Sequence, residues 1–584
     1  MSLPPPAPPY GLPTLVDVLR HRATAQPHRP AYCLLPDGEE ETERLTFADI
    51  DARARAVAAT LQHLAAGQDA AGTPPRALVA YPAEAGLDYM AAFLGCLYAG
   101  VIAVPCDAPT TRPGADRLGW IARDARPRFL LAPRPHPVDD GTGQPGIHLD
   151  VTEVPVAAAD GWRRPELHSE ALAFLQYTSG STRQPQGVMV THGNIMANER
   201  AIASSLINDE DSTFVGWLPL FHDMGMIANA LQPLYLGALS VLMPPAAFLA
   251  RPIRWLKAID RYRAAVAGGP NFAYELCVSR TDDASRRRLD LSCWRGAYNG
   301  AEVVRETTMR RFTAAFAVSG FSAEAFFACY GLAEATLIVA GAPRNAPPRI
   351  LDVDAAQVRA GRLIPATGAA DSRRAASSGR PVADTTVTVV DPENRRAVAD
   401  GTVGEIWIRG PGVAAGYWQD PAATAATFGA TRADGPPGTH LRTGDLGALV
   451  DGELYVVGRR KDLIIVRGQN HHPTDLEWTV QSSHPALRPS CGAAFSDDPA
   501  DDTDEQLVIV HEVNAENLSE EETTAVAAAI RQAIAARHGL HVHAVALARR
   551  GAVPKTSSGK VRRQACRDAY RAGWLPLLGH SLEA

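Results

Sequence analysis

The sequence predicts an α/β protein that has a large N-terminal domain and a smaller C-terminal domain. Segments with helical and strand-like patterns alternate from residue 15 to about residue 340, an order that is typical of mainly parallel sheets covered by helices. After about residue 380 short strands are separated by turn residues, which predicts a small antiparallel barrel or sheet. The segment GRRKD (458–462) then leads into a more polar final part, and we place the domain boundary there.

Three helices and two strands are predicted in the first 105 residues. Apolar residues recur at helical spacing in residues 15–24 and 46–64. In the second of these segments they form one stripe: Phe47, Ile50, Ala54, Val57 and Leu61. Residues 76–81 have the pattern of a strand, residues 88–100 that of a helix, and residues 101–105 that of the next strand.

Later strands follow the same logic. We expect them near residues 171–177, 213–217, 239–243 and 265–267, with helices between, and then at 385–391, 404–409 and 452–457. Residues 224–250 contain no Asp, Glu, Lys or Arg, and a stretch of this length is long enough to cross a bilayer. Prolines interrupt it, so a buried helix followed by a buried strand is the better interpretation.

Composition excludes some function classes. The formal net charge of -7 and the pI near 6.2 argue against nucleic acid or an anionic membrane as the main partner. With 46% hydrophobic and 21% charged residues, the composition is that of a globular protein with ample core. The eight cysteines are scattered and form no CxxC pair, a usage that fits a reducing compartment without disulfides or a zinc site. The Pro-rich residues 1–14 lack the basic and apolar parts of a secretory signal. We therefore expect a cytoplasmic protein without stable membrane insertion.

A polar loop follows the strand expected at 171–177. The sequence there is ALAFLQYTSGSTRQPQG (171–187), in which the apolar run breaks into Thr178, Ser179, Gly180, Ser181 and Thr182. Such a loop can direct several backbone N–H groups and hydroxyls to one point, which suits phosphate oxygens. It is not the GxxxxGK[ST] loop, because no Lys follows Gly at the required place. The alternative is an ordinary turn.

Two further stretches carry residues that suit a nucleotide. In Tyr330-Gly331-Leu332-Ala333-Glu334 the aromatic ring can stack on a purine, and the carboxylate can hold a Mg²⁺ that bridges phosphates. The alternative is a helix start with a surface Glu. The segment PKTSSGK (554–560) is a flexible loop that ends in Lys560, whose ammonium group could reach developing negative charge. A basic, solvated C-terminal helix is the alternative for the arginines that follow.

Two glycine turns complete the set. Asn299-Gly300-Ala301 forms a tight turn after a strand-like stretch and could line the same pocket. In Arg442-Thr443-Gly444-Asp445 a carboxylate lies beside a glycine turn, and such a group accepts hydrogen bonds from two vicinal ribose hydroxyls. A hairpin turn is the alternative.

Together these segments resemble the adenylate-forming superfamily of acyl-CoA synthetases, luciferases and peptide-synthetase adenylation domains. The resemblance covers essentially the whole chain after the Pro-rich start, and it rests on six motifs in order: YTSGSTRQPQG, WLPLFHDMG (217–225), YGLAE, LRTGDLG (441–447), GRRKDLIIVRGQNHHP (458–473) and PKTSSGK. It implies two doubly wound sheets and a small β-barrel in residues 1–458, a hinge at 459–461, and a mobile small α+β domain in residues 462–584.

Departures from the superfamily pattern narrow the resemblance to fatty acyl-AMP ligases. Arg183 and Gln186 stand where most members have Gly and Lys. The segments GPNFAYE (269–275) and KDLIIVRGQNHHPTDLE resemble this subgroup, and residues 350–378 lie where it carries an insertion. We hypothesise that this insertion packs between the domains and restricts the rotation that free CoA would need.

The resemblance implies an activity and its substrates. ATP and a medium- or long-chain fatty acid would give an acyl-adenylate and pyrophosphate, with Mg²⁺ as the metal. The acyl group would then pass to the thiol of a holo acyl-carrier protein of a polyketide or peptide synthase. Two alternatives remain open: a long-chain fatty acyl-CoA synthetase, and a catalytically inactive protein that binds nucleotide or acyl-adenylate.

Roles for single residues also come from the resemblance. The loop residues 178–182 would hold the β- and γ-phosphates, Glu334 the Mg²⁺, Tyr330 with Gly331 the adenine, and Asp445 with Arg459 the ribose. Lys560 would bridge the carboxylate and the α-phosphate in the transition state. Lys461 would occupy the hinge. His222, which follows the apolar WLPLF run, could guard the entrance to an acyl tunnel whose walls come from residues 224–250 and 269–275.

Overall fold

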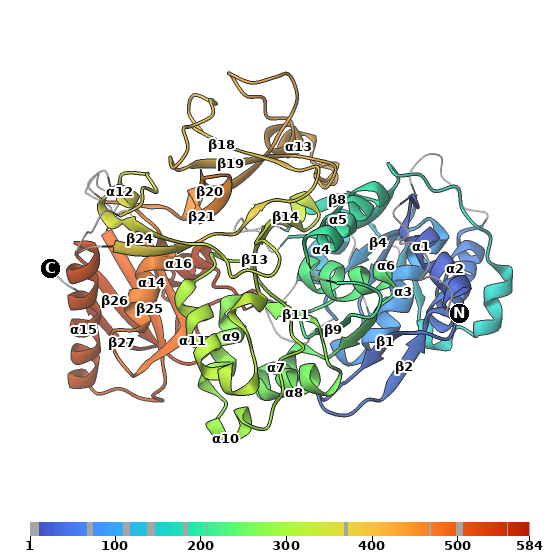
Figure 1. The fold of residues 1–584 in the computed structure, drawn as a ribbon, viewed down its shortest axis with the longest axis horizontal. Coiled ribbons are helices and arrows are strands. Elements are labelled where there is room, and N and C mark those ends of the chain that lie inside the picture. The colour runs from blue at the N-terminus through green and yellow to red at the C-terminus, as the bar shows by residue number, and fades with distance from the viewer. Residues whose placement is uncertain are drawn as a thin grey trace.

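A computed structural model places most of the chain. It describes residues 11–66, 74–108, 117–136, 146–178, 185–206, 208–366, 372–466, 469–497, 506–556 and 559–582. The ribbon has a large body and, at its left in Figure 1, a smaller lobe that carries the C-terminal elements. The α/β class and the large-plus-small arrangement predicted from the sequence are confirmed.

The first sheet has six strands in the order β6-β5-β3-β4-β7-β8. They are β3 (Arg76–Val79), β4 (Ile102–Pro105), β5 (Phe129–Leu131), β6 (Ile147–Leu149), β7 (Leu172–Tyr177) and β8 (Gly187–Thr191). All neighbours are parallel except β7 and β8. The strands consist mainly of apolar residues, as expected for a largely parallel sheet that is covered by helices on both faces.

Helices of the N-terminal region pack beside this sheet. They are α1 (Leu15–Ala25), α2 (Phe47–Ala65), α3 (Gly86–Ala99) and α4 (Arg117–Ala125). Helix α2 begins where predicted, because Thr46 and Asp49 form a reciprocal capping box. Gly95 on α3 allows a close approach to α2, since a Cβ there would lie 2.5 Å from a methyl carbon of Val57.

The second sheet has nine strands in the order β17-β14-β13-β12-β11-β9-β10-β1-β2. They are β1 (Pro30–Leu34), β2 (Glu43–Thr46), β9 (Thr213–Gly216), β10 (Leu239–Leu242), β11 (Val266–Gly269), β12 (Gly296–Asn299), β13 (Phe326–Gly331), β14 (Ile338–Gly341) and β17 (Arg380–Pro381). Strand β1 pairs in parallel with β10, which follows it by some 200 residues in the chain. Local patterns did not predict this pairing, because partner choice depends on the assembled sheet.

Helices of the second run surround this sheet. They are α5 (His192–Ser205), α6 (Gln232–Leu236), α7 (Pro245–Ala250), α8 (Ile253–Arg261), α9 (Asn271–Ser279), α10 (Asp283–Arg286) and α11 (Glu306–Phe316). In Figure 1, α7, α8, α9 and α11 lie below β9 and β11, on the side toward the small lobe.

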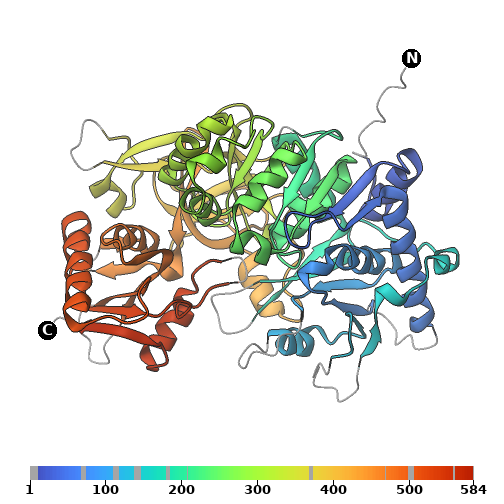
Figure 2. The ribbon, with the colours of Figure 1, turned by 90° about the horizontal axis from the view of Figure 1, so that it is seen from below.

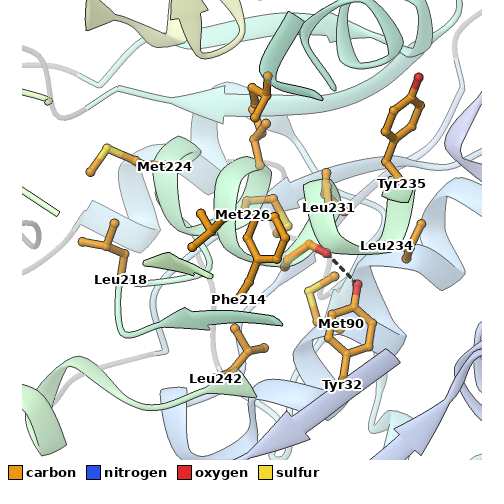
Figure 3. Close-up of a cluster of buried hydrophobic side chains, with 14 of the residues drawn as sticks. Tyr32, Met90, Phe214, Leu218, Met224, Met226, Leu231, Leu234, Tyr235 and Leu242 are labelled. Atoms are coloured by element: carbon orange, nitrogen blue, oxygen red, sulfur yellow. Dashed lines mark hydrogen bonds between the residues drawn. The ribbon is translucent and has the colours of Figure 1, made fainter. Parts of the chain in front are cut away.

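The uncharged stretch 224–250 is a buried helix followed by a buried strand, as predicted. A π-helix, η4 (Met224–Leu231), continues into α6, and β10 follows. Figure 3 shows Met226 and Leu231 of η4 packed among strand residues such as Phe214. Tyr32 donates a hydrogen bond of 2.9 Å to the carbonyl oxygen of Ala230 at this point. Within the described ranges, no helix is both long and apolar enough to span a membrane.

A four-stranded antiparallel sheet occupies the region for which a small barrel was predicted. Its strands, in order, are β18 (Thr386–Val390), β19 (Gly404–Arg409), β20 (Leu441–Val450) and β21 (Glu453–Arg459), with α13 (Pro421–Phe428) beside β20. The inserted segment forms the antiparallel pair β15 (Ile350–Asp354) and β16 (Ser372–Ala376), with α12 (Ala355–Arg359). Its apolar residues pack on β20 and β21 in a cluster with Ala448, Val450 and Tyr455.

The small domain has its own core. Its central sheet is β24-β25-β26-β27, made of β24 (Leu487–Asp497), β25 (Gln506–Val513), β26 (Ala544–Ala548) and β27 (Leu577–Leu582). The other elements are β22 (Ile464–Val466), β23 (Gln469–His471), α14 (Pro473–Gln481), α15 (Glu520–His538) and α16 (Arg563–Arg571). Two clusters of buried apolar side chains lie on this sheet. Figure 2 shows α15 at the left edge of the small domain.

Candidate functional site

A cavity of about 990 Å³ lies where the second sheet, the antiparallel sheet and the small domain meet. The residues that follow the C-terminal ends of β7, β12 and β13 form one wall, and the start of α14 and the loop before α16 form the opposite wall. Ligands of open α/β sheets bind at the carboxyl ends of the strands, so this is the expected place for a substrate site.

Most of the residues predicted for the site line this one cavity. Those that do are Thr178, His222, Ala301, Tyr330, Gly331, Glu334, Asp445, Arg459, Lys461 and Lys560. Asn299 and Gly300 are not among the lining residues; Asn299 is fully buried and donates to Asn271 Oδ1 at 3.1 Å, which supports the turn from behind. Ser179, Gly180, Ser181 and Thr182 lie outside the described residues.

Asp445 is the centre of a buried polar group. It is paired in register with Arg459 on the neighbouring strand, and Arg459 Nε donates to its Oδ1 at 3.1 Å. Tyr330 Oη donates to the other oxygen at 2.8 Å. Burial and the charge of Asp445 raise the pKa of Tyr330, so the hydroxyl stays protonated and remains a donor. Asp445 and Arg459, the two residues predicted to bind the ribose, are therefore joined by a direct hydrogen bond.

A glycine turn sets the direction of Asp445. Gly444 has a φ of +69°, a left-handed conformation that most side chains avoid. The N–H of Asp445 donates to Thr443 Oγ1 at 3.0 Å, and the Thr443 hydroxyl in turn donates to the Ile406 carbonyl at 2.8 Å. These contacts turn the carboxylate away from the strand surface and toward the cavity.

Glu334 lies on the short 3-10 helix η7 (Ala333–Ala335) after β13. Its Oε1 accepts a hydrogen bond of 2.9 Å from the hydroxyl of Tyr417. Burial raises the pKa of Glu334, and the Tyr417 bond partly opposes that rise. The segment is held from below by Asn198 of α5, which bonds to the backbone of Ala335 and Ile338.

Lys560 enters the cavity from the small domain. Its loop is closed locally, because Thr556 N donates to Lys560 O at 2.7 Å and Lys560 N donates to Thr556 Oγ1 at 3.0 Å. Gly559 has a φ of +82° and lies against Phe272 of α9, where a Cβ would come within 2.9 Å of the ring. Burial lowers the pKa of Lys560, and the negative charge of Asp223 partly offsets that effect.

His222 and Asp223 form an ion-pair geometry at the start of η4. His222 Nδ1 lies 2.6 Å from Asp223 Oδ1. Burial favours the neutral form of Asp223, but its neighbours His222 and Lys560 outweigh burial and lower its pKa. Asp223 and Lys560 both line the cavity, and each favours the charged form of the other, a coupling that sequence reasoning did not predict although both residues lie in recognised motifs.

Apolar side chains line another part of the cavity. They come from α5, η4, β13 and β14, and include Ile202, Leu206, Ala228, Phe327 and Leu337. Met224 and Phe272 also belong to the lining, as expected for walls drawn from residues 224–250 and 269–275. An apolar surface continuous with a nucleotide-sized polar region can hold an acyl chain beside a phosphate.

The carboxylate of Glu334 is a candidate protein ligand for Mg²⁺. Among the residues that the structure places, no group of three or more His, Cys, Asp or Glu side chains could hold a metal ion. Mg²⁺ is commonly bound by one or two carboxylates together with substrate phosphates, and the half-buried Glu334 that lines this cavity could supply such a carboxylate.

Several supporting residues escaped prediction. Tyr417, Asn198 and Asn271 act through hydrogen bonds that connect distant parts of the chain. Asn271 lies in the GPNFAYE segment (269–275), which the resemblance singled out, but nothing in the sequence indicated its hydrogen-bond partners. Tyr417 and Asn198 were not among the residues predicted for the site.

The fold and the site define an adenylate-forming enzyme. Two doubly wound sheets, an antiparallel sheet and a small domain enclose a cavity that is lined by Glu334, Asp445 and Lys560. This chain belongs to the AMP-binding enzyme family, whose pattern matches residues 19–418. A second match, described as the AMP domain of Disco-interacting protein 2-like proteins, covers residues 461–579.

Relatives match over nearly the whole length. A medium-chain-fatty-acid–acyl-carrier-protein ligase of Moorena producens is 40% identical over 576 residues, 96% of each chain. A long-chain-fatty-acid–AMP ligase of Mycolicibacterium smegmatis is 39% identical over 91% of this chain and 89% of its own. A fatty acyl-adenylate ligase from Legionella pneumophila, solved with acyl adenylate and pyrophosphate, is 36% identical over 98% of both chains, with a TM-score of 0.74.

Proposed function

We propose that this protein activates a medium- or long-chain fatty acid with ATP and passes the acyl group to a holo acyl-carrier protein. The observation that carries the proposal is the meeting of Lys560, Glu334 and Asp445 in one cavity that also has an apolar part. Relatives named as fatty-acid–acyl-carrier-protein and fatty-acid–AMP ligases, at 35–40% identity along the chain, support the same substrates.

In the first half-reaction a carboxylate oxygen of the fatty acid attacks the α-phosphorus of ATP. The bond from that phosphorus to the bridging oxygen breaks, and pyrophosphate leaves. Lys560 places a positive charge where negative charge develops, and Asp445 with Arg459 fixes the ribose. Such a reaction needs positioning and charge neutralisation more than covalent catalysis by the protein. Bound Mg²⁺, with Glu334 as its protein ligand, would neutralise phosphate charge.

In the second half-reaction the thiol sulfur of the carrier's phosphopantetheine attacks the acyl carbonyl carbon. The acyl carbon–oxygen bond to phosphate breaks, AMP leaves, and the thiol proton is released. We assign residues 459–461 as the hinge between domains 1–458 and 462–584, with Lys461 at its end. Lys461 lines the cavity, and burial lowers its pKa.

The proposal is tested by product analysis. The protein is incubated with ATP, Mg²⁺ and a panel of fatty acids, with either CoA or a holo acyl-carrier protein, and the products are identified by mass spectrometry. We expect acyl-adenylate in all active mixtures and acylated carrier protein as the main thioester. Abundant acyl-CoA from the intact protein would instead establish an acyl-CoA synthetase, and absence of acyl-adenylate would leave a binding protein without turnover.

The insertion supplies a second test of the acceptor. Arg373 of β16 forms an ion pair with Asp475 of α14, and the adjacent Arg374 bonds to Glu306 of α11 at 2.6 Å. The strand thus connects the large domain to the small domain. We propose that these pairs restrict rotation of the small domain when only free CoA is present, and that a carrier protein offsets the restriction by its own contacts.

Replacing both arginines, Arg373→Ala with Arg374→Ala, should raise the yield of acyl-CoA roughly several-fold, because each partly exposed pair contributes up to about 1 kcal/mol to the restricted orientation. Acyl-adenylate formation should change little. The matched control is Arg349→Ala, which removes an exposed ion pair to Asp451 inside the large domain. An unchanged ratio of acyl-CoA to acylated carrier in the double variant would contradict the restricting role of the insertion.

Glu334 should make the Mg²⁺ requirement depend on pH. Its carboxyl has a pKa raised by burial, so it becomes protonated, and unable to hold the metal, at a higher pH than an ordinary Glu. The Mg²⁺ concentration for half-maximal adenylation should therefore increase as pH falls from about 8 toward about 5.5. Titrations of the adenylation rate with Mg²⁺ at several pH values measure this.

Tyr417→Phe is the comparison that isolates Glu334 in this experiment. Removing the hydroxyl removes a hydrogen bond to the charged carboxylate, so the pKa of Glu334 should rise further and the whole profile should move to higher pH. Ionisation of ATP and of the fatty acid is the same in both proteins. Superimposable profiles for parent and Tyr417→Phe would show that Glu334 does not hold the metal.

A further inference from the structure

Arg305 is the residue before α11, at the end of the loop that connects β12 to α11 in the large domain. Its backbone N–H donates to Asn271 Oδ1 at 3.1 Å, and Asn271 also bonds to Asn299 and to the carbonyl of Val303. The loop that carries Arg305 is therefore pinned to α9 at three points. This anchoring fixes the origin of the arginine in the large domain.

The side chain of Arg305 crosses to the small domain. Its guanidinium carbon lies 4.5 Å from the centre of the Trp478 ring, a cation–π geometry. Its Nη2 donates to the carbonyl oxygen of Thr474 at 3.1 Å. Both partners are on α14, one turn apart, so a single arginine contacts one face of that helix at two places.

The same helix is tied to the loop of Lys560. Glu477, next to Trp478, accepts from Arg563 Nε at 2.6 Å and from Arg563 Nη2 at 2.7 Å. Arg563 is the first residue of α16, three positions after Lys560, and it also bonds to Asp462 beside the hinge at 3.2 Å. A fork-like arginine–carboxylate pair of this kind is directional as well as strong. Movement of α14 would therefore move the lysine loop.

We propose that Arg305 is a positioning residue that holds the small domain in the orientation in which Lys560 reaches the reacting phosphate. The proposal rests on the proposed function, because it assigns to that reaction a residue outside its recognised motifs. Arg305 holds α14 through its contacts with Trp478 and Thr474. The Glu477–Arg563 pair connects α14 to the loop of Lys560, so the position of α14 sets the position of that loop. On the large-domain side, Gly559 of the Lys560 loop lies against Phe272, the neighbour of the Asn271 that anchors the Arg305 loop. The loops of Arg305 and Lys560 therefore both contact α9.

This role predicts unequal effects on the two half-reactions. Adenylation needs Lys560 in the cavity, and misplacing a reacting group by about 1 Å costs on the order of 100-fold. Transfer from a preformed acyl-adenylate does not need the positive charge of Lys560 at the α-phosphate. It requires the thiol of the carrier protein to enter the cavity, and a loosened small domain permits that entry. Loss of Arg305 should therefore slow the first step and leave the second step intact.

The experiment compares Arg305→Ala with the parent in separate assays. Pyrophosphate release measures adenylation, and transfer to holo carrier protein is measured with chemically prepared acyl-adenylate. In Arg305→Ala we expect kcat for adenylation to fall about 10- to 100-fold, with KM for ATP within about twofold of the parent. The transfer rate should be unchanged or higher.

Conservative variants and a matched control separate positioning from folding. Arg305→Lys keeps the cation and should recover part of the lost rate, and Trp478→Phe keeps an aromatic face and should do likewise. Trp478→Ala should resemble Arg305→Ala, and the double variant should be little worse than either single one. The control is Arg261→Ala. Arg261 has the same two kinds of contact, a ring at 5.3 Å and a backbone carbonyl at 2.8 Å, but both are inside the large domain.

Three results would overturn the proposal. Parental adenylation by Arg305→Ala would show that the contact does not position Lys560. A raised KM for ATP at unchanged kcat would make Arg305 a nucleotide ligand. A parallel loss in both half-reactions, together with a lowered melting temperature, would make it a structural residue. A parent that forms no acyl-adenylate at all would instead refute the proposed function, and the positioning role would fall with it.

Discussion

Lys560→Ala should nearly abolish formation of the acyl-adenylate while leaving the fold intact. Lys560 is a cation of the small domain that lines the same cavity as Asp223 and Asp445, and the charge of Asp223 favours its charged form. Removing a charge contact that is made in the transition state costs roughly 3–4 kcal/mol, or about 100- to 1000-fold in rate. Pyrophosphate release, measured at saturating ATP and fatty acid, should fall by that factor.

Two variants sharpen the test of Lys560. Lys560→Arg keeps the charge but places it on a longer, planar group, so we expect it to recover only part of the rate. Lys555→Ala is the matched control from the same loop, because Lys555 contacts Cys491 Sγ at 3.0 Å and does not line the cavity. Pyrophosphate release by Lys560→Ala at close to the parental rate would show that the lysine has no role in the first half-reaction.

Asp445→Ala should weaken the use of ATP through the ribose. Asp445 is buried and its carboxylate accepts hydrogen bonds from Tyr330 and Arg459, which fix the orientation of the carboxylate. Charge-assisted hydrogen bonds to ribose hydroxyls contribute roughly 1.5–3 kcal/mol, which corresponds to about 10- to 150-fold in kcat/KM. The parent should discriminate against 2′-deoxy-ATP, and Asp445→Ala should lose most of that discrimination.

Controls for Asp445 separate the ribose contact from the loss of a charge near the hinge. Asp445→Asn keeps the shape of the group and should show an intermediate preference for ATP over 2′-deoxy-ATP. Glu393→Ala removes the ion pair of the neighbouring Arg460, which is exposed, and such a pair contributes about 0–1 kcal/mol. The ratio of kcat/KM for the two nucleotides is the readout, and the same ratio in parent and Asp445→Ala would exclude the contact.

Much of the secondary structure, and candidate residues for the site, could be predicted from the sequence because both depend on local chemistry. Helix α2 was predicted from one apolar stripe, and the structure adds the Thr46–Asp49 capping box at its start. The buried helix and strand at η4 and β10 follow from an uncharged run interrupted by prolines. Glu334, Asp445 and Lys560 could be named because each lies in a motif whose residue types suit a nucleotide and its transition state.

Contacts between distant segments could not be predicted in this way. The pairing of β1 with β10 joins residues about 200 positions apart, and the sequence of neither strand indicates which strand it pairs with. Tyr417 reaches Glu334, and Asp223 and Lys560 line the same cavity, only because the tertiary structure brings these distant segments together. The choice of partners depends on the lowest free energy of the whole assembly, in which burial and hydrogen bonding are satisfied together.

The sequence by itself determined the α/β class, the order of the elements, the family resemblance and the residues that we propose for the chemistry. Only the tertiary structure decided how the two domains are joined across the cavity. The cation–π contact of Arg305 with Trp478 and the ion pair of Arg373 with Asp475 connect surfaces that are far apart in the chain. Such contacts leave no periodic pattern in the sequence. Each needs only one side chain from each domain, and the two residues need no particular separation along the chain.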